Sequence, residues 1–368
     1  MLTKNDLQEL LDYQAQSPIL SVYLNTNPTG GTIEDHKLQL RSMLKDIDAP
    51  KDIEIIKTYL DHEYDWRSWC SIAIFSNADE NFFQAYPLAV DVRNRARLHH
   101  CPYVKPLAAL FDAHSGYGVV LIDKQQARFF SFHLGELQAE ARFSGEDVQR
   151  QKHGGGSQVT GRSRGVEGIA ETPDGDTQRN MQEAANVAAK FLKTNNVRRV
   201  LIGGTTENVS AFQEMLPKSW QSLIVGSFAM SMNAAYGEIQ EKALEIGAET
   251  EKHREEKLLQ TIITEAAKGR NGLTRFGEIL SAIKEGRVQT LVMKDGYKKD
   301  GYRCQGCGYI TVQKLDKCPF CAGEFEHISD AAELAVRNVL QAGGSVKVVE
   351  DEKNTLDEYG GIVALLRY

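Results

Sequence analysis

The chain carries a glycine-rich basic stretch that reads Val148-Gln149-Arg150-Gln151-Lys152-His153-Gly154-Gly155-Gly156-Ser157-Gln158-Val159-Thr160-Gly161-Arg162-Ser163-Arg164. Hydrophobic periodicity vanishes around it, from about residue 148 to about residue 176. Between Val148 and Val166 there are four Arg or Lys residues and no acid. Loops of this length are uncommon in compact domains and are usually functional or unstructured.

The residues of this stretch leave two interpretations open. Three consecutive glycines expose backbone N–H groups and prevent a conformation packed by side chains. A phosphate-binding P-loop does not fit, because no lysine follows the glycines in the required G-x-x-x-x-G-K-[ST] order. A flexible linker and an RNA-inserting loop both fit. The second explains why glycines, the amide of Gln158 and flanking cations occur together.

The composition is that of an ordinary globular protein with a negative charge. The 368 residues are 42% hydrophobic and 25% charged, which excludes a wholly disordered chain. No apolar run approaches the roughly 18–20 residues of a membrane span, and the N-terminus lacks a secretory pattern, so a cytoplasmic protein without membrane contact is expected. The net charge of −7 disfavours indiscriminate binding to nucleic acid. A local excess of cations, as in the loop, still suits RNA contacts at selected places.

Strand and helix patterns alternate on both sides of the loop and predict an α/β protein of three domains. These are an N-terminal α/β domain over residues 1–105, a central βαβ domain with a mostly parallel sheet over 106–230, and a C-terminal α/β domain over 231–368. A helical pattern is expected to run through to about residue 60. Strands are predicted at 19–24, 70–75, 117–123, 127–133, 197–202, 289–293, 346–349 and 362–366, and further helices at 5–11, 177–193, 234–268, 275–283 and 330–341.

Four of the six cysteines fall into one short segment, as two C-x-x-C pairs: Cys304, Cys307, Cys318 and Cys321. Each pair allows two thiolates to reach one ion from a tight turn, and two such turns complete a tetrahedron. Glycine and proline occur at the positions where these turns need them. The spacing therefore predicts a structural Zn²⁺ in a zinc ribbon inserted at residues 299–327 of the third domain. Two thiol pairs without a metal are the alternative.

The string Lys152-His153-Gly154-Gly155-Gly156-Ser157-Gln158 resembles the catalytic loop of the eukaryotic and archaeal peptide-chain release factor and Pelota family. Release factors carry Lys-His-Gly-x-Gly-Gly-Gln there, followed by an Arg-rich segment and a long helix. Further segments are similar to the family in the same order, and archaeal members also carry a cysteine zinc site in the third domain. These segments are Tyr117–Asp123, Val200–Gly204, Phe276–Gly286 and the C-terminal Tyr359–Tyr368.

This resemblance implies a three-domain architecture and roles for the loop residues. Gln158, with Ser157 and Gly156, would help to place the water that attacks the ester of peptidyl-tRNA. The residues expected to contact RNA are Arg150, Lys152, His153, Arg162 and Arg164. The implied partners are the ribosome, through rRNA and the tRNA acceptor end, and a translational GTPase such as elongation factor Tu.

Two departures from the release-factor pattern bear on function. The codon-reading tetrapeptide Asn-Ile-Lys-Ser occurs nowhere in this chain, and Ser157 replaces the middle glycine of Gly-Gly-Gln. The first departure points to bacterial, Pelota-like relatives that occupy the ribosomal A site without reading a codon, with residues 1–105 in a degenerate codon-reading position. The chain is therefore expected to act in ribosome rescue or hibernation. Hydrolysis of peptidyl-tRNA through Gln158 is the alternative, and an RNA-binding protein without a ribosomal role is a third.

Overall fold

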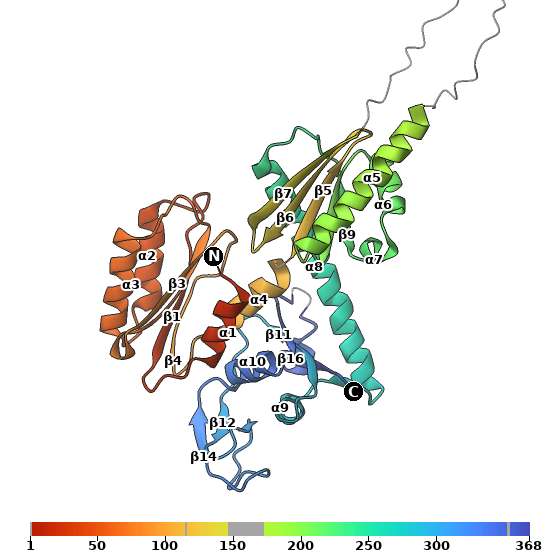
Figure 1. Cartoon of the computed structure of the whole chain (residues 1–368). Helices are drawn as coiled ribbons and strands as arrows, with labels where there is room; N and C mark the ends of the chain where they lie inside the picture. Colours follow the sequence, from red (N-terminus) through yellow and green to blue (C-terminus); the bar gives the residue numbers. More distant parts are fainter. Residues whose placement is uncertain (1, 115, 146–172, 352–353) are drawn as a thin grey trace, which may run out of the picture. The chain divides into compact units, whose positions relative to one another are not determined.

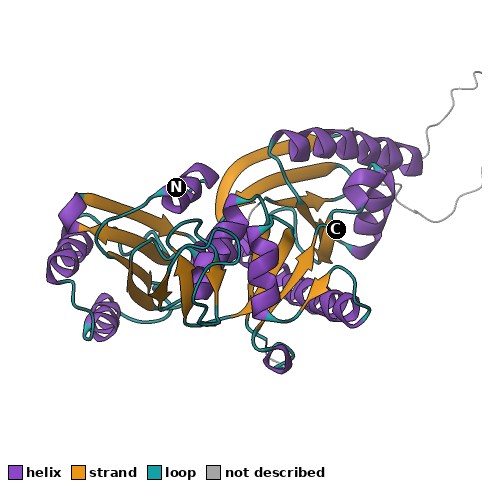
Figure 2. Cartoon of the chain, turned by 90° about the horizontal axis from the view of Figure 1, so that it is seen from below, coloured by secondary structure: helices purple, strands orange, loops and turns teal. Residues whose placement is uncertain are grey.

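The computed structural model describes residues 2–114, 116–145, 173–351 and 354–368. It is a mixed α/β structure whose chain forms two compact units (Figures 1 and 2). One unit combines Met1–Ala113 with Glu251–Tyr368, and the other is His114–Thr250. The long helix α8 (Tyr236–Ala267) begins in the second unit and ends in the first. The division into three domains stays a prediction.

Residues 2–99 of the first unit form an antiparallel sheet in the order β3-β2-β1-β4. Helices α2 and α3 cover one face (Figure 1), where Leu40 and Leu60 pack against Val22 and Ile74. The predicted helical pattern consists of two helices: the first ends at Leu44, and the second begins at Pro50, a residue suited to the first position of a helix. The elements are α1 (Lys4–Asp12), β1 (Ile19–Asn25), α2 (Ile33–Leu44), α3 (Pro50–His62), β2 (Ser71–Asn77), β3 (Phe82–Leu88) and β4 (Arg95–His99).

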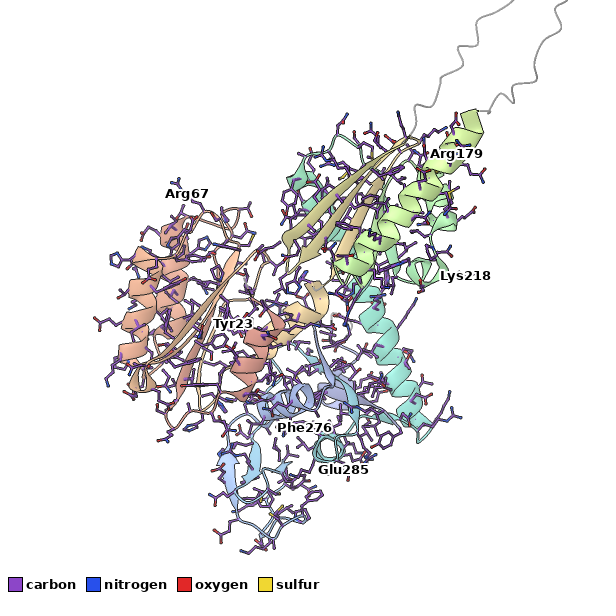
Figure 3. The ribbon with its side chains drawn as sticks, viewed as in Figure 1. Tyr23, Arg67, Arg179, Lys218, Phe276 and Glu285 are labelled. Atoms are coloured by element: carbon purple, nitrogen blue, oxygen red, sulfur yellow. The ribbon has the colours of Figure 1, made fainter. Side chains whose placement is uncertain are left out.

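The C-terminal part of the first unit has a second sheet, in the order β10-β16-β11-β15. Neighbouring residues of its central strands face opposite sides: Leu291 packs with α9 and α10, whereas Val292 packs with Leu259 and Ile262 of α8. Figure 3 labels Phe276, the first residue of α9, and Glu285, the residue that follows the end of α9. The elements are β10 (Gly272–Leu273), α9 (Phe276–Lys284), β11 (Val288–Lys294), α10 (Ala331–Gln341), β15 (Ser345–Val349) and β16 (Ile362–Leu366).

Between β11 and α10 the chain forms a small three-stranded antiparallel sheet, β13-β12-β14. Its strands are β12 (Gly301–Cys304), β13 (Ile310–Thr311) and β14 (Phe325–Ile328). Cys304 is the last residue of β12 and Cys307 lies in the turn after it, whereas Cys318 and Cys321 lie between β13 and β14.

The second unit is a five-stranded sheet in the order β7-β6-β5-β8-β9. Helices α5 and α6 cover one face, through Ala188 and Phe212, and α8 covers the other, through Ile239 and Ala243. The expected mostly parallel sheet is wrong, because only the β5–β8 and β8–β9 pairings are parallel. Strands β5, β6 and β7 are joined by tight turns, which only antiparallel strands allow. The elements are β5 (Tyr117–Ile122), β6 (Gln126–His133), β7 (Glu136–Ser144), α5 (Pro173–Thr194), β8 (Arg199–Gly204), α6 (Thr206–Met215), α7 (Lys218–Gln221) and β9 (Ile224–Phe228).

Every helix in the described part of the chain is too short or too polar to serve as a membrane span.

Candidate functional site

The sulfur atoms of Cys304, Cys307, Cys318 and Cys321 all lie within 4.8 Å of one another. Cys304 and Cys321 Sγ are 3.4 Å apart, and Cys307 and Cys318 Sγ are 3.6 Å apart. A tetrahedral ion with metal–sulfur bonds of about 2.3 Å requires sulfurs about 3.8 Å apart, whereas a disulfide requires about 2.05 Å. The cluster therefore has the geometry of a metal site.

The backbone presents the two cysteine pairs in equivalent turns. In the first, Gly308 N donates to Cys304 O at 2.9 Å, and Cys304 N donates to Tyr309 O at 2.8 Å. In the second, Ala322 N donates to Cys318 O at 2.8 Å, and Cys318 N donates to Gly323 O at 3.0 Å. Matching turns place both thiols of each pair on the same side, so that the two pairs face each other across the cluster.

Two glycines make room for the sulfurs. A Cβ at Gly306 would lie 3.1 Å from Cys321 Sγ, and one at Gly323 would lie 3.0 Å from Cys304 Sγ. Gly308 has a φ of +72°, in the left-handed region that favours glycine. Gly306 and Gly323 thus let the backbone of one turn approach a thiol of the other closely.

Backbone hydrogen bonds shift the pKa values of two thiols in this cluster. The N–H of Cys307 points to the sulfur of Cys304 and lowers the pKa of that thiol to about 6. The N–H of Gly323 acts in the same direction on Cys321, but hydrogen bonds with the neighbouring thiols raise the pKa of Cys321 to about 12. One sulfur is therefore ready to ionise near neutral pH, and binding of a cation releases the other protons.

The cysteine cluster can hold a metal ion in a structural role. Four cysteine ligands fill a tetrahedral coordination sphere and leave no position open for a substrate or a catalytic water. The ring of Tyr309 packs at 4.7 Å from that of Phe320, and Lys284 Nζ of α9 donates to Cys307 O at 2.6 Å. The metal would thus join the two turns of the small sheet, which is itself attached to α9.

The flanks of the glycine-rich loop are fixed on one turn of the second unit. On the incoming side, Gly145 N donates to Gln125 O at 2.8 Å. On the outgoing side, Asn180 of α5 is buried and its Nδ2 donates to Lys124 O at 3.4 Å. Asp123 Oδ1 in turn accepts from the backbone of Gln125 at 2.8 Å, which orders the turn. Spacing in the sequence gives no sign of these anchors, because they form only when β5, β6 and α5 pack together.

The sequence-predicted loop residues lie outside the described residues, and their roles stay predictions. They are Arg150, Lys152, His153, Gly156, Ser157, Gln158, Arg162 and Arg164. The structure describes the flanks of this segment, Gly145 and α5, and their hydrogen bonds to the turn at Lys124 and Gln125.

Residues 102–248 match the family model described as bacterial archaeo-eukaryotic release factor family 10. This segment includes the loop and nearly all of the second unit. Two curated relatives are named peptide chain release factor subunit 1. The protein from Thermococcus onnurineus is 26% identical over 74% of this chain and 72% of its own length. The protein from Methanocaldococcus jannaschii is 24% identical over 72% of this chain and 69% of its own length.

Solved structures of related proteins are also similar. The chain of S. cerevisiae Dom34 has a TM-score of 0.43 and 11% identity, over 81% of this chain and 79% of that chain. The Archaeoglobus fulgidus Pelota structure has a TM-score of 0.34 and 14% identity, over 83% of this chain and 81% of that chain. At such low TM-scores the relationship rests on the sequence matches. By these matches the chain is a relative of the archaeo-eukaryotic release factors, and its residues 102–248 match bacterial family 10 of that group.

Proposed function

We propose that this protein binds the ribosomal A site and acts in ribosome rescue or hibernation, without decoding a stop codon. The observation that carries the proposal is that the family match over residues 102–248 encloses the basic glycine-rich loop. Archaeal relatives that align over about three quarters of the chain are named as peptide chain release factors. Absence of the Asn-Ile-Lys-Ser tetrapeptide from the sequence is the reason for placing the activity outside decoding.

The loop has the properties needed to enter an RNA-lined cavity. Its four cations can neutralise phosphates, and its glycines allow close approach of the backbone. The described residues on both sides of the loop, Gly145 and Asn180, hydrogen-bond to the turn at Lys124 and Gln125. Anchoring of this kind reduces the entropy lost when the loop is ordered on a ribosome.

An alternative is that the protein hydrolyses peptidyl-tRNA on the ribosome. Gln158 is retained at the position where release factors carry the glutamine of Gly-Gly-Gln. Ser157 adds a Cβ, which would cost about 1 kcal/mol if the backbone there has a positive φ. The same loop could therefore occupy the peptidyl-transferase centre with or without catalysis.

Two further assignments belong to this proposal. Zinc is the metal we assign to the cysteine cluster, because four thiolates in a tetrahedral arrangement are the donor set of structural zinc sites. A translational GTPase such as elongation factor Tu is the partner that we propose delivers the protein to the ribosome. The support for this partner is the similarity of the chain to release factors. Cytoplasmic localisation follows from a ribosomal role.

Co-sedimentation with vacant ribosomes tests ribosome binding. The full chain should pellet with ribosomes, and the variant with Gln at positions 150, 152, 162 and 164 should bind more weakly. The affinity of the wild type falls as salt rises. In a plot of log affinity against log salt concentration, the slope should become shallower by about 0.7–0.9 for each phosphate that the variant no longer neutralises. Arg275→Gln is the matched control, because Arg275 is an exposed arginine of the first unit. If wild-type protein does not bind ribosomes, the proposal fails.

Release of labelled peptide from stalled ribosome complexes separates the two activities. Under the hydrolase alternative, wild-type protein releases peptide and Gln158→Ala does not, while both bind ribosomes. Under the proposed non-hydrolytic role, both bind and neither releases peptide.

A further inference from the structure

A cavity of about 790 Å³ lies within the first unit, apart from the loop and the cysteine cluster. It is bounded by the segment after α1, the end of β4, the strands β12–β14 and helix α10. The four clustered cysteines are not among the described residues that line it. Its volume falls in the range of about 300–1,000 Å³ that is typical of sites for small ligands.

Arg337 of α10 lines this cavity and is only 7% exposed. Its Nη2 donates to the carbonyl oxygen of Tyr13 at 2.7 Å. Its Nη1 is buried and has no hydrogen-bond partner among the described residues. Burial of an unpaired charged group costs several kcal/mol, and guanidinium groups are therefore nearly always paired when buried. The unsatisfied nitrogen is a free donor at the wall of the cavity, which an acceptor atom of a ligand can satisfy.

The acids near Arg337 have other partners, except that Oε2 of Glu333 is buried and has no hydrogen-bond partner among the described residues. Glu333, one turn earlier on α10, accepts from Val104 N at 3.1 Å and lies 3.8 Å from Lys105 Nζ. Glu326, on the wall of the cavity, pairs with Arg303 at 2.5 Å. Burial raises the pKa of Glu333 to about 7, so this carboxyl group only partly balances the charge of Arg337. The guanidinium at the cavity wall therefore favours an anion.

Three histidines contribute to the walls of the same cavity: His99, His100 and His327. Burial lowers the pKa of His99, whose Nδ1 lies 3.3 Å from Cys101 Sγ, so its ring is neutral at pH 7. Burial also raises the pKa of Cys101 to about 12, so this thiol stays neutral and offers the guanidinium no counter-charge. Imidazole rings offer flat faces on which a nucleobase stacks, and ring nitrogens that exchange hydrogen bonds with it. The volume exceeds what a bare inorganic anion fills.

We propose that this cavity binds a phosphate monoester of nucleotide size, with Arg337 Nη1 donating to a phosphate oxygen and the histidine rings contacting the base. A free mononucleotide and the 5′-phosphorylated end of an RNA strand both present this chemistry. The site is independent of the loop and of the proposed action at the peptidyl-transferase centre.

Calorimetric titration of the full chain tests the proposal. The probes are AMP, adenosine, and one short RNA with and without a 5′-phosphate. Phosphorylated probes should bind and their unphosphorylated counterparts should bind at least about tenfold more weakly, because they lack the group that accepts a hydrogen bond from the guanidinium. Arg337→Gln should weaken phosphate-dependent binding by about tenfold to hundredfold. Arg275→Gln, an exposed arginine paired with Glu278, should leave it unchanged.

Chemical modification of histidines in the wild-type protein tests the same site without the Arg337→Gln variant. His100 and His327 are exposed on the cavity wall and should be protected from diethyl pyrocarbonate by AMP, whereas His62 on α3, which does not line the cavity, should react equally with and without it. If AMP binds more tightly than the 5′-phosphorylated RNA, the ligand is a free mononucleotide. If the RNA binds more tightly, the ligand is an RNA end. The proposal is overturned if no phosphorylated probe binds, if Arg337→Gln binds as tightly as wild type, or if the ligand protects neither histidine.

Discussion

Gly145 is the last described residue before the glycine-rich loop, and its surroundings leave no room for a side chain. A Cβ there would lie 2.2 Å from Oδ1 and 2.4 Å from Cγ of Asn180. Asn180 is buried and anchors the other flank of the loop. Gly145→Ala should therefore lower the free energy of unfolding by about 1–3 kcal/mol, because Asn180 must move from its packed position. Chemical denaturation of the full chain measures this change.

The matched control for Gly145 is Gly237→Ala in helix α8. No atom lies within 4 Å of a Cβ at Gly237, and alanine is the better helix former by up to about 1 kcal/mol. Its free energy of unfolding should be unchanged or slightly raised. Equal effects of the two substitutions would contradict the packing described at Gly145.

At the scale of elements, the small sheet β13-β12-β14 depends on its metal. The sheet has few residues, and the buried apolar residues around its cysteines are few, so metal coordination supplies much of its stability. Cys304→Ser should abolish binding of the roughly one metal ion per chain that four thiolates hold, and should expose residues 301–328 to proteolysis. Metal analysis of freshly purified protein, followed by limited proteolysis, measures both effects.

Cys70→Ser provides the control for the cysteine cluster. Cys70 is a half-buried free thiol outside the cluster, so its replacement should leave metal content unchanged. Retention of the full metal content by Cys304→Ser would show that these cysteines do not hold the ion.

Elements with strongly apolar residues could be predicted from the sequence, whereas the edge strand β7, with alternating exposed residues, could not. The buried strands β1, β5, β8 and β11 are confirmed near their predicted positions, because each is a short continuous apolar run. Strand β7 was not predicted, since its residues alternate between half-buried and exposed at the edge of the sheet. The mostly parallel sheet predicted for the central domain was wrong, because the direction of pairing depends on which strands become neighbours.

At the scale of the whole molecule, the sequence allowed the cysteine cluster and the family to be predicted from local motifs. Both are encoded by short, contiguous spacing. The cavity at Arg337 joins residues as distant as Tyr13 and Gln341, and the loop anchors join the turn at Lys124 with α5. Such sites exist only after long-range packing, so no window of the sequence contains them.

Chemical probing of ribosomal RNA tests whether this protein binds the A site through its glycine-rich loop. Ribosomes are probed with wild-type protein, with Arg275→Gln and with the variant that has Gln at positions 150, 152, 162 and 164. Wild type and the control should protect A-site nucleotides of the peptidyl-transferase centre, and the loop variant should not, because its loop no longer neutralises RNA phosphates. Protection confined to other ribosomal regions, or full protection by the loop variant, would contradict binding of this protein to the A site through its glycine-rich loop.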